Sequence, residues 1–275
     1  TLPKLQLAQT ITQPKCNNQT GEILFNTNTI LQHYAEVTSS GYYMKNNSTG
    51  NFEPIPTNPL TGIEEGDYTF SYVYNESYCA DTFTVAIKEP APIGINFSHR
   101  NIARYGDTTG VISVVLSGGT PPYSIYASGG NLLTEQDEFI TLSDDKVPFS
   151  NLAEGTYTFT VKDAHECRAE ASQEILQPDA PLTLVFNKDA SSTNIRCHGD
   201  TTGELYVAAQ GGWGDYTYTF RGIENRNGVF KNLKATTTPE VEMIYVKDNY
   251  RVTDSIDIRI TEPLPLRANI IEKQS

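Results

Sequence analysis

The chain has 275 residues, of which 19% are charged, and its 33 acidic against 20 basic residues give a formal net charge of −13. A surface of this sign repels phosphate backbones and anionic lipid headgroups, so nucleic acid is excluded as an expected partner. No apolar run approaches the roughly 20 residues that span a bilayer, so we expect no membrane insertion by this segment.

A strand entered through a proline is predicted four times along the chain, with the same alternation of apolar and polar residues after the proline. Its copies are Leu2–Leu7, Pro92–Phe97, Pro181–Phe186 and Pro265–Ile270. Such regular recurrence indicates that the chain is built from repeats.

Just before the last three copies, a predicted strand stops at a proline, because proline cannot donate to a ladder. These prolines are Pro90, Pro178 and Pro263. Since the chain begins at Thr1 without a methionine, we expect a mature or excised piece of a longer array. The expected repeats are residues 1–90, 91–178 and 179–263, with 264–275 as the first strand of a truncated fourth repeat.

The pentapeptide Gly-Asp-Thr-Thr-Gly occurs at Gly106–Gly110 and again at Gly199–Gly203. An alternating apolar run follows each copy and ends on a glycine pair, at Gly118-Gly119 and at Gly211-Gly212. A third copy, which keeps only part of this pattern, lies at Thr20–Phe25. A period of about 90 residues indicates tandem domains, each large enough to bury its own core.

Inside each repeat the apolar residues alternate with a period of two, as they do in half-buried strands. Tyr68–Val73 and Tyr157–Val161 are also rich in β-branched and aromatic residues. Turn signals recur about every 8 to 12 residues, and no long segment has a helical stripe. The expected fold class is all-β, with tandem immunoglobulin-like antiparallel β-sandwiches in a linear array.

The start of two strands sharpens this prediction. Tyr68 and Tyr157 each stand two residues after a glycine, with an apolar residue five positions before the tyrosine. This is the layout of the tyrosine corner of immunoglobulin-like sandwiches, in which the hydroxyl donates to nearby backbone. In the third repeat Val241 or Met243 stands in the place of the tyrosine, so no corner of this type is expected there.

Taken in order, these motifs resemble the SprB-type repeat of Bacteroidota cell-surface proteins. The third repeat supplies Cys197–Gly203, and the second supplies Gly118–Tyr123, Leu152–Asp163 and Cys167. The likeness covers nearly the whole chain and is weak only across residues 26–60. It implies a surface-exposed, exported protein of the kind that includes gliding-motility adhesins, with export through the type IX system, and such repeats are commonly stalks.

We therefore expect a non-catalytic stalk or spacer of a large adhesin, located extracellularly on the outer face of the outer membrane. Its expected partners are neighbouring repeats of the same chain, together with surface glycans or other cell-surface proteins. Two alternatives stay open. The repeats are themselves a glycan- or protein-binding module, or they are the spacer of an exported enzyme.

The sequence contains no Gly-x-Ser-x-Gly, His-Glu-x-x-His or phosphate-binding glycine loop, so we expect no catalysis by this segment. Glu64-Glu65 and Asp144-Asp145 are adjacent carboxylates. Solvated turns explain them better than an acid/base pair does.

Asp107 and Asp200 have more than one interpretation. Hard oxygen ligands between glycines in an acidic protein fit calcium, whereas a tight turn in which the aspartate binds its own backbone needs no ion. We prefer the turn and expect no cofactor. The family resemblance adds O-glycosylation, because Asp-Thr-Thr and Asp-Ser-Ile look like its acceptor signals, and this would place sugars on Thr108, Thr201 and Ser255.

Four zinc-type side chains occur in the second and third repeats. They are His165, Cys167, Cys197 and His198. Because the first two close one strand and the last two open the next repeat, we expect them roughly 30 Å apart and predict no zinc site.

Trp213 is the only tryptophan, and it follows a glycine pair in a loop that also contains Tyr216. The two rings could stack on a glycan. Packing of the indole against a neighbouring domain is the structural alternative, and we prefer it.

In the family layout, the residues that open and close a repeat come together. The resemblance therefore implies a disulfide between Cys16 and Cys79 inside the first repeat, which fits an oxidising compartment.

The other two repeats have each lost one cysteine. Tyr105 stands where the partner of Cys167 is expected, and Val252 stands where the partner of Cys197 is expected. We therefore expect Cys167 and Cys197 to be reduced and packed as small apolar groups.

Overall fold

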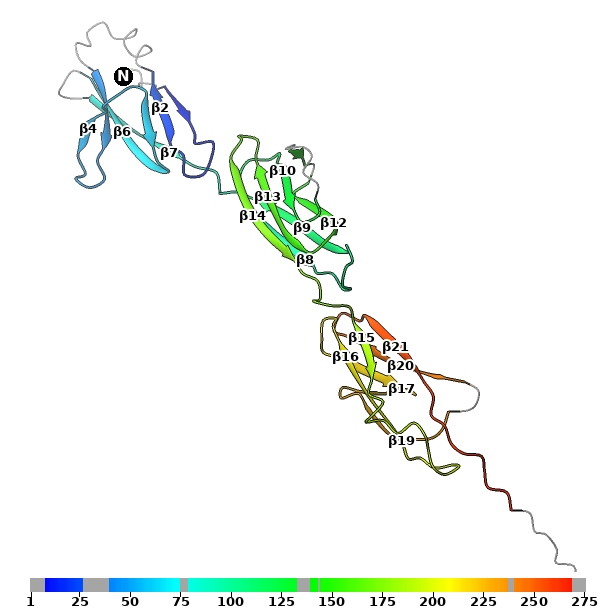
Figure 1. Ribbon diagram of the computed structural model, residues 1–275. Helices are drawn as coiled ribbons and strands as arrows, with labels where there is room; N and C mark the ends of the chain where they lie inside the picture. Colours follow the sequence, from blue (N-terminus) through cyan, green and yellow to red (C-terminus); the bar gives the residue numbers. More distant parts are fainter. Residues whose placement is uncertain are drawn as a thin grey trace, which may run out of the picture.

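The structure is a computed structural model that describes residues 8–26, 40–74, 79–132, 139–142, 144–236 and 240–268. Figure 1 shows three β-sandwiches in a row, joined by short extended segments. The described residues form 21 strands and no helix, so none of their segments is a helix that could cross a membrane. We call the three units the first, second and third sandwich.

The described residues of each sandwich form seven strands. The first has β1 (Gln9–Thr12), β2 (Gly21–Phe25), β3 (Ser40–Lys45), β4 (Phe52–Pro54), β5 (Leu60–Ile63), β6 (Gly66–Tyr74) and β7 (Cys79–Ile87). The second has β8 (Gly94–Arg100), β9 (Gly110–Ser117), β10 (Ser124–Gly129), β11 (Ile140–Thr141), β12 (Lys146–Leu152), β13 (Gly155–Lys162) and β14 (Arg168–Ile175). The third has β15 (Thr183–Phe186), β16 (Gly203–Gln210), β17 (Thr217–Phe220), β18 (Ile223–Asn225), β19 (Val229–Leu233), β20 (Glu242–Lys247) and β21 (Thr253–Ile258).

The strand order is the same in all three sandwiches. One sheet holds the first, second and fifth strands, and the other holds the fourth, third, sixth and seventh in that order. The ladders between named strands are antiparallel. In a constant-type immunoglobulin domain the fourth strand joins the first sheet, so its place here is a variation on that fold. The predicted all-β class of tandem immunoglobulin-like sandwiches is confirmed.

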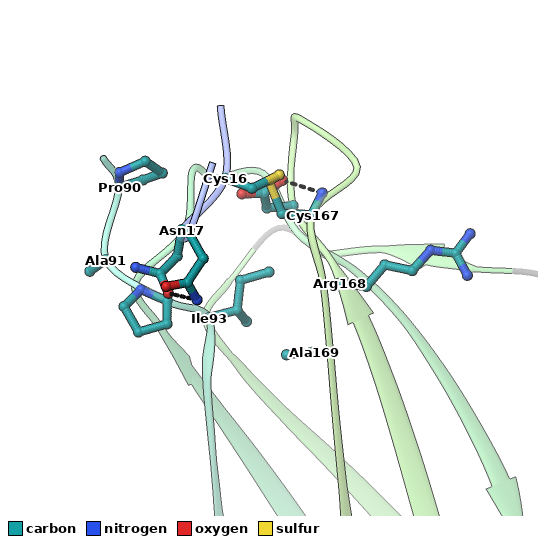
Figure 2. A pocket seen from close by; sticks show the side chains of 12 residues that line it. Cys16, Asn17, Pro90, Ala91, Ile93, Cys167, Arg168 and Ala169 are labelled. Atoms are coloured by element: carbon teal, nitrogen blue, oxygen red, sulfur yellow. Dashed lines mark hydrogen bonds between the residues drawn. A yellow bond between two sulfur atoms is a disulfide. The ribbon is translucent and has the colours of Figure 1, made fainter. Parts of the chain in front are cut away.

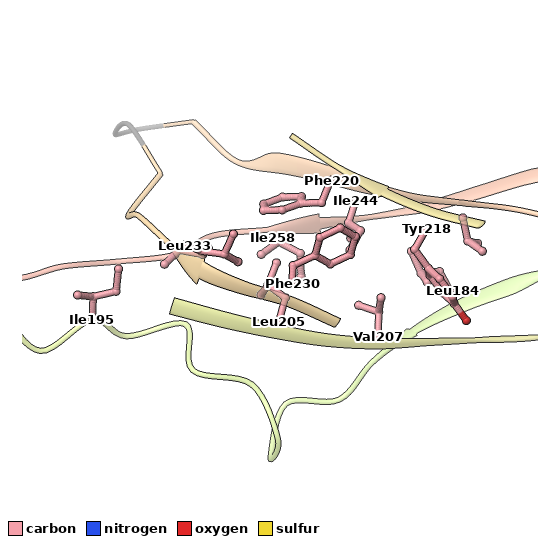
Figure 3. Close-up of a cluster of buried hydrophobic side chains, with 12 residues drawn as sticks. Leu184, Ile195, Leu205, Val207, Tyr218, Phe220, Phe230, Leu233, Ile244 and Ile258 are labelled. Atoms are coloured by element: carbon pink, nitrogen blue, oxygen red, sulfur yellow. The ribbon is translucent and has the colours of Figure 1, made fainter. Parts of the chain in front are cut away.

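The alternation in the sequence becomes an inward and an outward face of each sheet. In β9, Ile112, Val114 and Leu116 are buried while the residues between them are partly exposed. Each sandwich has its own cluster of buried apolar side chains between its sheets. Figure 3 shows the cluster of the third sandwich, in which Phe220 of one sheet packs against Phe230 of the facing sheet, beside Leu205 on the strand next to Phe230. Burial of each such side chain stabilises its sandwich by about 1.5–3 kcal/mol.

Both predicted tyrosine corners are present. The Tyr157 hydroxyl donates to the carbonyl oxygen of Ala153 at 2.8 Å, and the Tyr68 hydroxyl donates to that of Glu64 at 3.1 Å. Each bond fixes the turn that connects the fifth strand to the sixth.

The third sandwich replaces the corner with an ion pair. The residue that matches Tyr157 is Glu242, so the prediction of Val241 or Met243 at this place is wrong by one position. Arg221 Nε donates to Glu242 Oε1 at 2.9 Å, and its Nη2 donates to the Lys234 carbonyl oxygen at 3.1 Å. Lys234 occupies the position of Ala153 in the second sandwich, so the same carbonyl group is held by a different donor.

The two ends of the chain limit what can be compared with the predicted strands. The first predicted strand, Leu2–Leu7, lies outside the described residues. Pro265 to Ala268, the described part of the last predicted strand, belongs to no strand. The residue ranges predicted for the repeats stay a prediction.

Candidate functional site at the junctions

Each sandwich has a tight turn between its first and second strands, which we call the opening turn. In each one the N–H of the fourth residue donates to the carbonyl oxygen of the first, at 3.2–3.3 Å. The three opening turns are Cys16–Gln19, Arg104–Asp107 and Cys197–Asp200.

The opening turn is tied to the residue before the proline that ends its own sandwich. Gly199 N–H donates to Glu262 Oε2 at 2.7 Å, and Gly106 N–H donates to Gln177 Oε1 at 2.8 Å. Asn18 N–H makes the same bond to a carboxylate oxygen of Glu89, at 2.6 Å. The donors have φ of 59° to 82°, a left-handed conformation that glycine and asparagine adopt most readily.

A second turn joins the sixth strand of a sandwich to the seventh, and we call it the closing turn. In the second and third sandwiches it begins at a buried aspartate, Asp163 or Asp248, each at most 4% exposed. The closing turns are Asp163–Cys167 and Asp248–Val252.

Each buried aspartate accepts three backbone hydrogen bonds. Asp248 Oδ1 accepts from the N–H groups of Tyr250 and Val252 at 2.9 Å, and its Oδ2 accepts from Trp213 at 3.0 Å. Asp163 makes the equivalent three bonds in the second sandwich. The carboxylate therefore fixes both the closing turn and the glycine-pair loop beside it.

The two turns lie at opposite ends of a sandwich. The opening turn of one sandwich consequently meets the closing turn of the next, and these contacts form two junctions (Figure 1).

The first junction is covalent. Cys16 in the first sandwich forms a disulfide with Cys167 in the second, with their Cα atoms 5.6 Å apart. Figure 2 shows the bond beside Asn17 and the connecting residues Pro90 and Ala91, at the rim of a shallow cavity. The first and second sandwiches are thus joined both by the chain and by a disulfide.

The predicted disulfide between Cys16 and Cys79 is wrong. Gln13, just before the opening turn, donates to the carbonyl oxygen of Ala86, near the end of β7, whereas Cys79 is the first residue of that strand. Nine residues of strand separate its ends by about 27 Å, far beyond the roughly 7 Å that a disulfide allows between Cα atoms. The side chain of Cys79 lies outside what the structure describes.

The expectation for the other two cysteines is half correct. Cys197 is a free thiol, as expected, but it is exposed rather than packed as an apolar group. Cys167 is oxidised, not reduced. Sequence reasoning looked for its partner inside the repeat, but in a tandem array the partner lies on the neighbour.

Glycine contacts show which residues are equivalent at the closing turns. A Cβ built on the first glycine of the second strand would approach Cγ2 of an isoleucine within 2.7–3.4 Å in every sandwich. The pairs are Gly21 with Ile87, Gly110 with Ile175 and Gly203 with Ile260. Eight residues before these isoleucines stand Cys79, Cys167 and Val252.

The second junction has no cysteine on either side. Val252 stands in the position of Cys167, as predicted, but the equivalent of Cys16 is Arg104, so the prediction of Tyr105 is wrong by one residue. Arg104 and Val252 line the same cavity between the second and third sandwiches.

At the second junction a tryptophan of the third sandwich contacts the second sandwich. Trp213 Nε1–H donates to the Ile102 carbonyl oxygen of the second sandwich at 2.8 Å. Its ring stacks on Tyr250, with centroids 4.7 Å apart and planes 22° apart. The preferred alternative, packing of Trp213 against a neighbouring unit, is confirmed.

Tyr216, the other residue predicted to contact a ligand, also has a structural role. Its hydroxyl donates to the Gly211 carbonyl oxygen at 2.6 Å, just as the Tyr123 hydroxyl donates to Gly118 in the second sandwich at 2.5 Å. The alternative of a glycan contact by Trp213 and Tyr216 stays untested.

The predicted ion and sugar positions are all exposed. Asp107 and Thr108 lie in the second opening region, Asp200 and Thr201 lie in the third, and Ser255 faces outward on β21. Within the described ranges, no three His, Cys, Asp or Glu side chains gather as metal ligands. Calcium binding at the aspartates and glycosylation of the hydroxyls stay predictions.

The four zinc-type side chains do not meet. Cys167 forms the disulfide with Cys16, whereas Cys197 is a free thiol in the opening turn of the third sandwich. His198 contacts Glu262 at 2.8 Å instead. The paired carboxylates lie in turns, where the carbonyl oxygens of Glu64 and Asp145 accept hydrogen bonds.

The third opening turn and the loop of Trp213 lie within one stretch that a known family shares. Residues 190–224 match the SprB repeat. The SprB repeat match agrees with the resemblance drawn from the sequence, and it spans β16, the glycine pair and β17. The match supports a cell-surface repeat-domain protein.

Comparison with other proteins adds little beyond this family. No curated protein sequence matches the chain. Among solved structures, Drosophila OTK extracellular domains 3–5 align over 88% of this chain and 91% of theirs, with 10% identity and a TM-score of 0.26. The N-terminal four Ig domains of Dscam1 isoform 6.44 align over 94% and 74%, with 8% identity and a TM-score of 0.25.

Proposed function

We propose that this segment is a stiff, non-catalytic spacer in an exported cell-surface adhesin of the gliding-motility type. The observation that carries the proposal is the disulfide between Cys16 and Cys167. A single connecting segment lets two domains swing, whereas a second attachment beside it removes that hinge. A spacer needs this property because it must hold a distal part of the protein away from the cell.

The second junction supports the same role. The hydrogen bond from Trp213 to Ile102 and the prolines at Pro178 and Pro181 restrict bending between the second and third sandwiches. We therefore propose neighbouring repeats of the same chain as the main partners of this segment.

The chemistry of the first junction supports a location outside the cytoplasm. A disulfide persists in oxidising surroundings outside the cytoplasm, and the match to the SprB repeat supports the cell surface. We assign export through the type IX system and a place on the outer face of the outer membrane as part of the same proposal.

Small-angle scattering tests the spacer. Strands of eight or nine residues give each sandwich roughly 30 Å of length, so three in a row extend to about 100 Å. We expect a maximum dimension near that length, and a broader distance distribution for Cys16→Ser than for the matched Cys197→Ser. A compact particle of about 60 Å, or equal distributions for the two variants, would contradict the proposal.

A further inference from the structure

The third sandwich carries the same opening turn as the first. Cys197 occupies the place of Cys16, since each carbonyl oxygen accepts the N–H of the residue three positions later at 3.3 Å. Glu262 anchors this turn just as Glu89 anchors the first one. Cys16 is bonded to the next sandwich, whereas Cys197 is exposed and reduced.

The two junctions differ from each other in both the opening-turn residue and the closing-turn residue. The first junction has cysteine on both sides, Cys16 and Cys167. The second has Arg104 and Val252 in those positions, and it has cysteine on neither side. A cysteine in an opening turn therefore points to a cysteine in the closing turn that meets it.

Two leucines follow Pro263, and one of them matches residues that pack against a sandwich core elsewhere in the chain. Ile93 and Leu182 stand shortly after Pro90 and Pro178, and both pack against the core of the sandwich that follows them. Leu266 has the same place after Pro263, yet it is fully exposed. Leu264 is 89% exposed.

Close packing of these residues against a glycine pair shows what would cover Leu266. A Cβ added to Gly119 would lie 2.7 Å from Cγ1 of Ile93, and one added to Gly212 would lie 3.2 Å from Leu182. By analogy, Leu266 would pack against the glycine-pair loop of another sandwich. In each sandwich that has the buried aspartate, this loop lies beside the closing turn because the aspartate binds both.

We propose that the end of the third sandwich, formed by Cys197, Glu262 and Leu266, docks a further sandwich of the same kind whose closing turn carries a cysteine. The two thiols form one disulfide and release two protons and two electrons. A small-molecule disulfide such as oxidised glutathione accepts these electrons and protons and leaves as two thiols. The inference rests on the repeat geometry and not on the spacer role, so either can fail without the other.

An extended chain tests the proposal directly. Residues 1–266 are followed by a second copy of residues 94–178, which keeps Leu266 in the place of Ile93 and supplies a second Cys167. Cys79→Ser removes a competing thiol. After oxidation with glutathione disulfide, we expect a linked peptide between Cys197 and the added Cys167, and maleimide labelling of Cys197 should fall to the level of Cys16.

Two variants of the extended chain serve as controls. Replacing the added Cys167 with valine should leave Cys197 fully labelled, and Leu266→Asp should slow the formation of the bond. The proposal is overturned if Cys197 stays labelled while Cys16 and the first Cys167 pair normally in the same chain. Disulfide-linked dimers of the extended chain in place of the internal bond would overturn it as well.

Discussion

At the scale of single residues, the closing turn depends on one buried carboxylate. Asp248 is 3% exposed and accepts three backbone N–H groups, none of which has an equivalent acceptor if the side chain is removed. Buried donors left without a partner cost about 1–3 kcal/mol each in proteins. This carboxylate is therefore a structural residue, although the sequence alone does not show that it is buried and accepts three N–H groups.

We predict that Asp248→Ala lowers the free energy of unfolding of the third sandwich by about 3 kcal/mol. Trp213 is the only tryptophan, so its fluorescence during urea unfolding reports on this sandwich. Asp189→Ala, an exposed position in the same sandwich, should change stability by less than about 0.5 kcal/mol. Equal effects of the two substitutions would show that the three bonds contribute nothing.

We predict that Tyr42 makes the first sandwich sensitive to alkali. Burial, together with Tyr72 nearby, raises the pKa of Tyr42 from 10.0 to about 12, and its hydroxyl has no hydrogen-bond partner among the described residues. The unfolded chain loses this proton at lower pH than the folded chain does. Stability should therefore be complete below pH 10 and fall by on the order of 2 kcal/mol as pH rises to 12.

Tyr42→Phe should abolish this contribution to alkaline destabilisation. It should also leave stability at pH 7 unchanged or slightly higher, because no hydrogen bond is lost and a buried hydroxyl is removed. Calorimetric melting between pH 7 and pH 12 measures both effects. A variant that melts in alkali as the parent does would rule out Tyr42 as the group responsible.

At the scale of strands and turns, the same carbonyl group is held in three sandwiches by two kinds of donor. Tyrosine does so in the first two, and Arg221 fixed by Glu242 does so in the third. Sequence reasoning found both tyrosine corners because glycine, tyrosine and strand lie close together in the chain. It missed the substitute because Arg221 lies 21 residues before Glu242, on a different strand end.

We predict that Arg221→Ala lowers the stability of the third sandwich by about 1–2 kcal/mol, because the Lys234 carbonyl oxygen loses its donor. The matched control is Arg226→Ala. Arg226 pairs with Asp215 at 2.8 Å, but both side chains are more than half exposed, so its loss should cost less than about 0.5 kcal/mol. Urea unfolding followed by Trp213 compares them, and a larger loss for Arg226→Ala would refute this role for Arg221.

At the scale of the whole molecule, the sequence predicts the sandwiches better than it predicts their contacts. Alternation and turn residues are local signals, and they correctly indicated the fold class and strands such as β6, β9 and β13, although Pro265 to Ala268 belongs to no strand. The pairing of Cys16 with Cys167 depends on which ends of two sandwiches meet, and residues 151 positions apart carry no local sign of it. Trp213 was the one residue whose contact with a neighbour could be anticipated, since a lone tryptophan in a glycine loop needs a surface to cover it.

If the two junctions are equivalent, a disulfide can be moved from one to the other. We predict that the double variant Arg104→Cys with Val252→Cys forms a bond across the second junction, since these residues occupy the places of Cys16 and Cys167. Peptide mapping without reductant detects it, and each single variant is the control. Two free thiols in the oxidised double variant would show that the junctions differ in geometry.

The central claim is that the disulfide joins two neighbouring sandwiches rather than closing one. Peptide mapping without reductant measures this most directly, after alkylation of the native protein. The structure predicts a linked peptide that contains Cys16 and Cys167, with Cys197 recovered in alkylated form. A linked peptide that contains Cys16 and Cys79 would contradict the account, because it would return the bond to the interior of the first sandwich.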